Sequence, residues 1–176
     1  MRIVGGKYRG RIFNPGKSFK ARPTTDFAKE SLFNILTNLV DFNEIKCLDL
    51  FAGTGSISYE LISRGCNDLT MIELNFQHLT FIKSVLKNLN EKAKVYRADV
   101  FKFLEGEKTK YDLIFADPPY DHPRFKEVPE LILKRGLISE GGFMVIEHSM
   151  AYDFSNLPGF SEMRKYGSVH FSFFKG

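Results

Sequence analysis

Segments with strand-like and helix-like patterns alternate through most of the chain after residue 22. Leu79, Ile82, Leu86 and Leu89 recur at helical spacing and form the clearest apolar stripe. Short apolar runs predict strands at residues 45–51, 69–73, 95–98, 111–116 and 143–146, with helices starting at 23–26 and spanning 56–64, 79–89 and 128–135. Such alternation implies right-handed crossovers and a mostly parallel sheet covered on both faces. The sequence therefore predicts a doubly wound, Rossmann-like α/β fold.

Both ends of the chain depart from this alternation. Residues 161–166 and 168–174 indicate two strands around Gly167, which predicts an antiparallel hairpin at the sheet edge. At the N-terminus, the apolar pairs 3–4 and 12–13 flank several glycines, and we expect them to form a second, small hairpin.

Positive charge is concentrated at the start of the chain. Residues 1–22 carry seven basic and no acidic side chains, whereas the rest has 18 basic and 21 acidic ones. A basic arm on a mildly acidic body is typical of a protein that binds a polyanion, and a solvated tail is the alternative. We therefore divide the chain into an arm, residues 1–22, lying outside the core, and one catalytic domain, residues 23–176. The arm residues expected to contact a nucleic acid are Lys7, Tyr8, Arg9, Arg11 and Arg22.

The composition is that of a single folded domain. A chain of 176 residues with 43% hydrophobic side chains can bury a substantial core. No apolar run approaches the ~20 residues of a membrane span, and the N-terminus has no apolar signal segment. Two cysteines are too few for a secreted disulfide framework, and the four histidines lack metal-ligand spacing. We therefore expect a cytoplasmic protein with no metal site and no membrane contact.

The stretch Asp117-Pro118-Pro119-Tyr120 directly follows a predicted buried strand. A carboxylate and a carbonyl oxygen can both accept hydrogen bonds from an exocyclic amine, while a tyrosine ring can stack on the base that carries it. Two prolines would hold these acceptors rigidly in place. An ordinary turn is the alternative, but the residue types favour methyl transfer onto a nucleobase nitrogen, with all four residues as catalytic candidates.

A glycine-containing loop follows the first predicted strand and opens a helix. In open α/β sheets, ligands bind beyond the carboxyl ends of the strands, and glycines let them approach the backbone closely. A dinucleotide fingerprint would place its third glycine where this chain has Ser58, which disfavours an NAD-dependent oxidoreductase. Phe51, Gly53 and Gly55 are the cofactor-binding candidates of this loop.

Acidic side chains follow the predicted strands at the same edge of the sheet. Asp49, Glu73 and Asp99 would surround a ligand there, and they suit one that carries positive charge. S-adenosylmethionine has a sulfonium and an ammonium charge. We assign Glu73 to its ribose hydroxyls, Asp99 to its adenine amine and Asp49 to the region of its ammonium group.

Several segments resemble the bacterial 16S ribosomal RNA guanine-N2 methyltransferases of the RsmD type. The N-terminal arm and the stretch from Arg22 to Asp26 are the most specific parts of the resemblance. The family usually has an arginine where this chain has Phe27. The matching segments are residues 2–10, 22–26, 30–34, 48–55, 97–99 and 117–120.

The resemblance implies a class I S-adenosylmethionine-dependent methyltransferase fold. By resemblance, the cofactor is S-adenosylmethionine, and the target is a guanine exocyclic N2 amine in 16S rRNA, within the small ribosomal subunit or its assembly intermediate rather than in naked RNA. An adenine-N6 methyltransferase acting on DNA or RNA stays open, because the same tetrapeptide serves that amine. An oxidoreductase and a catalytically silent RNA-binding module are the alternatives from other classes.

Overall fold

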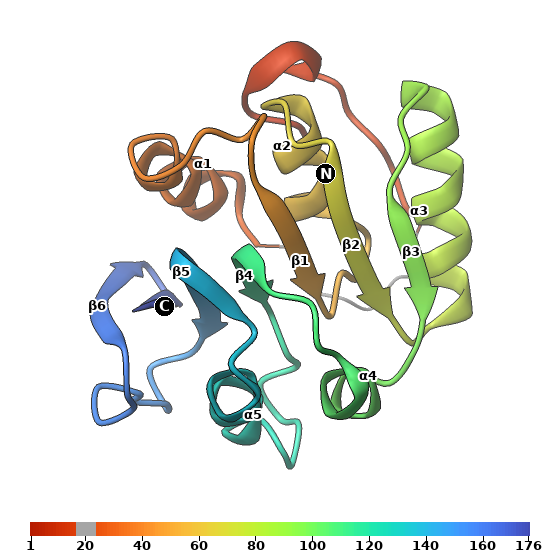
Figure 1. Cartoon of the computed structure of the whole chain (residues 1–176). Helices are drawn as coiled ribbons and strands as arrows, with labels where there is room; N and C mark the ends of the chain where they lie inside the picture. The colour runs from red at the N-terminus through yellow and green to blue at the C-terminus, as the bar shows by residue number, and fades with distance from the viewer. Residues whose placement is uncertain (17–23) are drawn as a thin grey trace.

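A computed structural model describes residues 1–16 and 24–176, whose strands form one sheet in the order β3-β2-β1-β4-β5-β7-β6 (Figure 1). The neighbours from β3 to β5 pair in parallel, while β7 pairs antiparallel with both β5 and β6. The doubly wound sheet and its antiparallel C-terminal hairpin are therefore confirmed. The bounds are β1 Lys46–Leu50, β2 Asp68–Glu73, β3 Lys94–Arg97, β4 Tyr111–Ala116, β5 Ile138–His148, β6 Phe160–Tyr166 and β7 Val169–Lys175.

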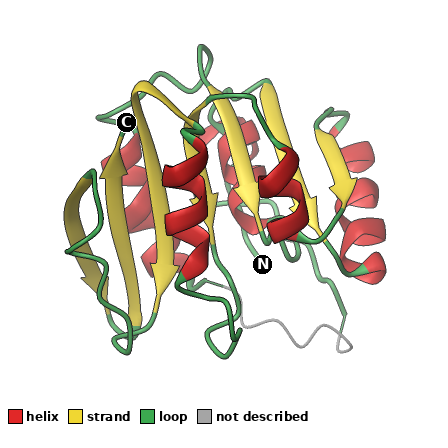
Figure 2. Cartoon of the chain, turned by 60° about the horizontal axis from the view of Figure 1, so that its bottom comes forward, coloured by secondary structure: helices red, strands yellow, loops and turns green. Residues whose placement is uncertain are grey.

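Helices cover both faces of the sheet, as Figure 2 shows. One core cluster joins one face of the sheet to α1, α2 and α3, and a second joins the other face to α4 and α5. The bounds are α1 Asp26–Leu36, α2 Ser56–Ser63, α3 Phe76–Leu89, α4 Val100–Gly106 and α5 Glu127–Arg135, with a short 3-10 helix, η1, at Gly6–Tyr8. This three-layer arrangement is what alternating strands and helices require.

Two elements differ from the sequence prediction. Helix α4 was not predicted, because its seven residues are too few to show helical spacing; Asp99 caps it by accepting a hydrogen bond from the Lys102 N–H (3.0 Å). Strand β5 starts five residues earlier than predicted. Gly141 and Gly142 interrupt its apolar pattern beside an irregularity in the β4–β5 register.

The N-terminal segment packs against the body of the protein. Arg2 and Ile12 form an isolated antiparallel bridge, so the expected pairing exists, but η1 occupies the connection between its two sides. Ile3 is 1% exposed and belongs to the core cluster under α1–α3. The expectation that this arm lies outside the core is wrong for residues 1–16, because an apolar residue at position 3 has a buried site to fill.

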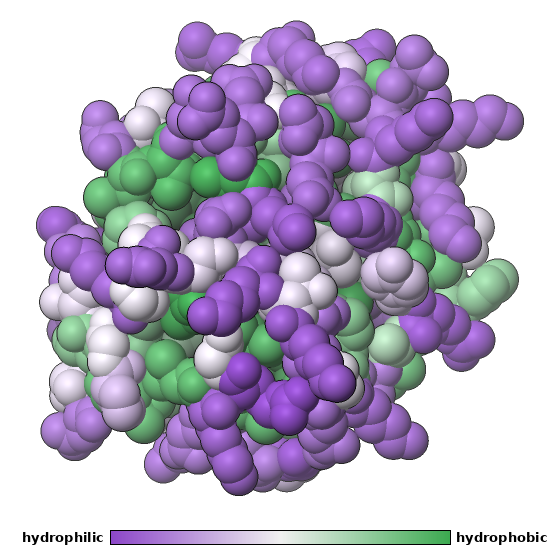
Figure 3. Space-filling model, in the orientation of Figure 1, coloured by the Kyte–Doolittle hydropathy of each residue, from purple (hydrophilic) through white to green (hydrophobic). Residues whose placement is uncertain are grey.

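Hydrophilic side chains interrupt the apolar ones across the face shown in Figure 3. Within residues 1–16 and 24–176, none of the helices combines the length and the apolar character that crossing a membrane demands.

Candidate active site

A cavity of about 890 Å³ lies at the carboxyl ends of the parallel strands. This is the edge where doubly wound sheets bind ligands, and it contains the point between β1 and β4 at which the strand order reverses. The structure brings most of the predicted site residues together here. The cavity is lined by Phe51, Gly53, Glu73, Asp99 and the whole stretch Asp117, Pro118, Pro119 and Tyr120.

The alternation of side chains along the strands explains why carboxyl groups gather in this cavity. In β4, Leu113 and Phe115 face the α1–α3 layer, so Asp117, two residues further, continues on the same face. In β5, Val145 faces that layer, and Glu147 follows by the same rule. Ala116 pairs with Ile146, which sets Asp117 and Glu147 side by side on neighbouring strands.

Asp117 is half-buried among other carboxyl groups. Burial raises its pKa well above the usual range, and the charges of Glu147 and Asp49 raise it further. A group in this position binds a proton readily unless a cation or a hydrogen-bond donor enters the cavity. A cationic methyl donor would supply the cation, and an amine substrate would supply the hydrogen-bond donor.

Hydrogen bonds fix the backbone around the two prolines. The Tyr152 hydroxyl donates to the Tyr120 carbonyl oxygen (2.6 Å), and the His122 N–H donates to the Pro119 carbonyl oxygen (2.8 Å). The Tyr120 hydroxyl donates to a Glu147 carboxylate oxygen (3.3 Å), which orients its ring. The acceptors of this stretch are therefore held in place before any ligand binds.

The glycine loop has an unusual backbone that Glu73 stabilises. Phe51, Gly53 and Gly55 all have positive φ (60°, 56° and 84°), which is strained for a phenylalanine. The Glu73 carboxylate accepts hydrogen bonds from the N–H groups of Gly53 and Asn75, both at 2.7 Å. Each carboxylate oxygen has a second lone pair, so Glu73 can still accept from a ligand hydroxyl.

Two predicted cofactor residues do not line the cavity. Asp49 is 2% exposed, and its carboxylate accepts a hydrogen bond from the buried Ser58 hydroxyl (2.5 Å). Burial raises the pKa of Asp49 to about 7. Gly55 packs against the Tyr59 ring, whose Cζ would lie 2.5 Å from an added Cβ, so this glycine serves close packing. Contact of Asp49 or Gly55 with a cofactor stays a prediction.

An aromatic wall completes the cavity on the side of α4. His122 stacks on Phe101 at 5.2 Å between ring centroids, and both rings stand edge-on to Phe51. The Arg124 guanidinium lies 4.0 Å above the Phe101 ring on the outside. His122, one of the four histidines that lack metal-ligand spacing, lines the cavity.

Sequence reasoning missed Glu147, which also lines the cavity. The signal was available, because Glu147 follows the fifth predicted apolar run just as Asp117 follows the fourth. Thr25, Ser168 and Val169 were missed as well. They reach the cavity through the start of α1 and the β6–β7 turn, whose positions in space no local pattern indicates.

The charge of the cavity is one-sided. Among the described residues, its lining includes five carboxyl side chains and no lysine or arginine. This set fits a cationic ligand and disfavours the pyrophosphate of a dinucleotide. In the described part of the chain, no group of three or more histidine, cysteine, aspartate or glutamate side chains is placed to hold a metal ion.

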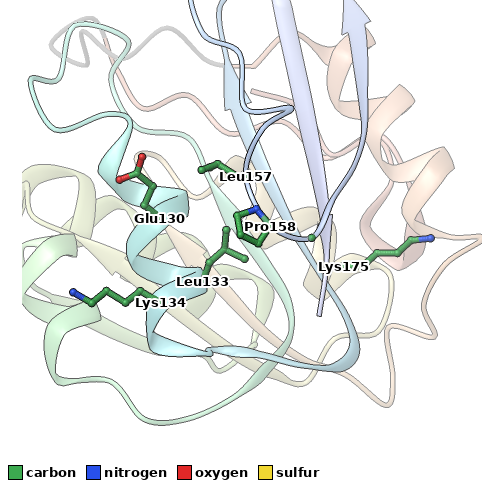
Figure 4. Close-up of a pocket in the computed structure, with 7 residues that line it drawn as sticks. Glu130, Leu133, Lys134, Leu157, Pro158 and Lys175 are labelled. Atoms are coloured by element: carbon green, nitrogen blue, oxygen red, sulfur yellow. The ribbon is translucent and has the colours of Figure 1, made fainter.

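A second pocket, of about 450 Å³, lies at the opposite edge of the sheet. Figure 4 shows Leu133 of α5 beside Leu157 and Pro158, with Lys134 and Lys175 at its sides. None of the predicted site residues lines it, and its apolar surface is open to solvent. The carboxyl-edge cavity therefore remains the candidate site.

The arm residues predicted to bind nucleic acid differ in their contacts within the protein and in their exposure to solvent. Lys7 forms an ion pair with Glu91 (2.6 Å), and the Tyr8 hydroxyl donates to the Leu89 carbonyl (3.0 Å) and to Glu91 (2.5 Å). Arg9 and Arg11 are exposed, Arg11 lying 5.6 Å from the centre of the Tyr8 ring. Arg22 lies outside the described residues.

Comparison with known proteins identifies the family. A family model described as "Conserved hypothetical protein 95" matches residues 1–175. The chain belongs to this family. It is 36% identical over 153 residues to "Putative rRNA methyltransferase YlbH" of Bacillus subtilis (strain 168), covering 84% of this chain and 82% of that protein. It is 31% identical over 161 residues to "Ribosomal RNA small subunit methyltransferase D" of Escherichia coli (strain K12), covering 90% and 79%.

A solved structure has the same fold as this member of the family. "Putative methyltransferase yhhF from Escherichia coli" superposes with a TM-score of 0.84 at 28% identity, covering 99% of this chain and 96% of that one. The predicted resemblance to the RsmD type and the predicted Rossmann-like methyltransferase fold are therefore confirmed.

Proposed function

We propose that this protein transfers a methyl group from S-adenosylmethionine to the exocyclic N2 amine of a guanine in small-subunit ribosomal RNA. The observation that carries the proposal is that Asp117-Pro118-Pro119-Tyr120 and the glycine loop line one acidic cavity. Two relatives at 36% and 31% identity are named as ribosomal RNA methyltransferases, and one of these names specifies the small subunit.

The cavity residues suit S-adenosylmethionine in both charge and shape. When bound, this cofactor supplies a methyl group on a positively charged sulfur. Glu73 would accept hydrogen bonds from its ribose hydroxyls, and Asp99 from its adenine amine. The positive φ values at Phe51 and Gly53 turn the loop backbone along the cavity, where the cofactor would lie. Asp49, buried behind the loop, would add negative charge near the ammonium group.

Methyl transfer needs an oriented amine and a place for one proton. The amine lone pair of guanine is delocalised into the ring, so acceptors at Asp117 and at the Pro118 carbonyl would turn the N–H groups and expose that lone pair. The nitrogen forms a bond to the methyl carbon, the carbon–sulfur bond breaks, and its electron pair stays on sulfur. The amine then releases one proton, which the raised pKa of Asp117 suits it to accept. Alignment of the reacting atoms supplies most of the acceleration.

Tyr120 would stack on the extruded base. The Tyr120 hydroxyl donates to Glu147, which orients the ring, and the Tyr120 backbone carbonyl accepts from the Tyr152 hydroxyl, which fixes the backbone. Such preorganisation reduces the cost of holding a base outside its RNA stack. An rRNA substrate is also consistent with the exposed basic side chains at positions 9 and 11 and with the cytoplasmic location expected from the sequence.

The test is transfer of labelled methyl groups to small ribosomal subunits from cells that lack the gene. We expect label in N2-methylguanosine after digestion of the RNA, and only a small fraction of that label with Asp117→Ala. Label in N6-methyladenosine would support the adenine alternative instead. Subunits from cells that keep the gene are the matched control, because their target is already methylated and should take up no label.

A further inference from the structure

Glu147 lies on the side of the cavity away from the candidate cofactor residues. Along the sheet, β3 and β2 lead to Asp99 and Glu73, β1 leads to the glycine loop, and β4 and β5 lead to Asp117 and Glu147. If the cofactor spans the first three strands and Asp117 faces the reacting atoms, the target base must lie over β5 and the β6–β7 turn. Glu147 is the carboxyl group at that position.

The surroundings of Glu147 keep it a hydrogen-bond acceptor. Its side chain is 4% exposed and nevertheless lines the cavity. The Thr24 hydroxyl donates to one carboxylate oxygen (2.7 Å), and the Tyr120 hydroxyl donates to the other (3.3 Å). A carboxylate has about four lone-pair sites, so a carboxylate that accepts from hydroxyl groups can also accept from a ligand.

We propose that Glu147 selects guanine by accepting a hydrogen bond from N1–H, the group next to the amine that is methylated. The assignment rests on the proposed function and specifies how its base is chosen. Guanine presents N1–H and the N2 amine side by side, so two neighbouring carboxyl groups can each take one donor. Adenine presents a lone pair at N1 beside its amine, and a carboxylate facing that lone pair would repel it.

Asp117 and Glu147 would then have different roles toward the base. Asp117 faces the amine and receives its proton, while Glu147 holds the ring edge and exchanges no proton. The β4–β5 register pairs Ala116 with Ile146, so Asp117, directly after β4, lies beside Glu147 of β5. Two neighbouring carboxyl groups are what two neighbouring donors of one base require. Burial of the Glu147 carboxyl group is destabilising, but it strengthens discrimination between guanine and adenine. A wrong base would leave polar groups unpaired where water cannot reach them.

The test compares RNA carrying guanine at the target position with RNA carrying 2-aminopurine there, each assembled into small-subunit particles. 2-Aminopurine keeps the amine at carbon 2, lacks the carbonyl oxygen at carbon 6 and has an N1 lone pair in place of N1–H, so the change in preference on substitution of Glu147 is the diagnostic quantity. We expect wild-type kcat/KM to be about ten- to hundredfold higher for guanine, the range for one good base contact. Glu147→Gln offers an amide N–H to that lone pair, so the preference should fall by about tenfold or more.

Asp121→Asn is the matched control, because Asp121 also lines the cavity. The preference of this variant enzyme for guanine over 2-aminopurine should equal that of the wild type. A purely structural Glu147 would lower both rates together in Glu147→Gln and leave the preference intact, which would overturn the assignment. Should that variant not fold, equal rates for the two bases in the wild-type enzyme would overturn it as well. Wild-type enzyme that methylates neither base would contradict the proposed function itself.

Discussion

Asp117 is the residue of the candidate site to which we assign a role in the methyl-transfer step. It lines the cavity, follows β4 directly and has a pKa raised by burial and by two neighbouring acids. Asp117→Ala should abolish most methyl transfer, because the amine loses its acceptor. S-adenosylmethionine affinity, measured by calorimetry, should stay within a few-fold of wild type or rise slightly, since the cofactor does not depend on this carboxyl. Asp117→Asn keeps one acceptor oxygen and should be milder. Loss of cofactor binding in both variants would move Asp117 to the cofactor site.

Asp49 should make the stability of the ligand-free protein depend on pH. Burial raises its pKa to about 7 in the folded protein, from the ordinary aspartate value of 3.8. Between these values the folded state binds more protons than the unfolded state, so the free energy of unfolding falls as pH rises. A shift of about three units corresponds to roughly 4 kcal/mol, lost between about pH 4 and pH 7.

Asp49→Asn removes this titration and keeps an acceptor for the Ser58 hydroxyl. Relative to wild type, the variant should gain stability steadily from pH 4.5 to pH 7.5, as measured by urea unfolding. Asp117 shifts in the same direction in both proteins, so the difference between them is the diagnostic quantity. Parallel stability curves for the two proteins would show that Asp49 ionises at an ordinary pH.

At the scale of elements, a buried ion pair joins the N-terminal segment, α1 and α2. Lys29 Nζ lies 3.6 Å from the Glu60 carboxylate, and the two side chains are 1% and 0% exposed. The Glu60 carboxylate also accepts hydrogen bonds from the N–H groups of Val4 and Gly5, while Lys29 donates to the Arg2 carbonyl oxygen. Two charged side chains thus link three segments that also meet in one apolar core cluster.

Lys29→Met should destabilise the protein by about 3 kcal/mol, because it leaves the charge of Glu60 buried. The effect should fall at the low end of the usual range, since Arg64 still lies 3.6 Å from Glu60. The midpoint of urea denaturation measures it, and Lys83→Met, which changes an exposed lysine on α3, is the control. Equal midpoints for the two variants would mean that the buried pair contributes nothing net.

For the whole molecule, local patterns predicted the architecture better than they predicted contacts between distant segments. Strand β4 and the C-terminal hairpin were found within a residue or two because their apolar runs are continuous and bounded by turn residues. The position of Ile3 in the core was not predicted, because a single apolar pair among glycines and basic residues gives no period. Glu147 could have been predicted as a residue that follows an apolar run, as Asp117 does, but its place beside Asp117 depends on the β4–β5 register.

The fold also sharpens the prediction for RNA binding by the basic arm. Lys7 is neutralised within the protein by Glu91, whereas Arg9 and Arg11 are exposed. We therefore expect the paired variant Arg9→Gln and Arg11→Gln to weaken RNA binding and flatten its salt dependence. Each phosphate contact that is lost should lower the log–log slope by about 0.7–0.9. Because both side chains lie outside the core contacts of this segment, the thermal midpoint should barely change.

The control for this pair is Lys108→Gln with Lys110→Gln. It removes the same charge from an exposed loop at the start of β4. If net charge alone attracts RNA, both pairs should flatten the slope equally. If Arg9 and Arg11 touch phosphates, only their variant should do so, while Lys7→Gln should have a smaller effect because Glu91 already competes for that charge. Unchanged slopes in the arginine pair would assign the arm to folding alone, through the burial of Ile3 and the hydrogen bonds that Val4 and Gly5 donate to Glu60.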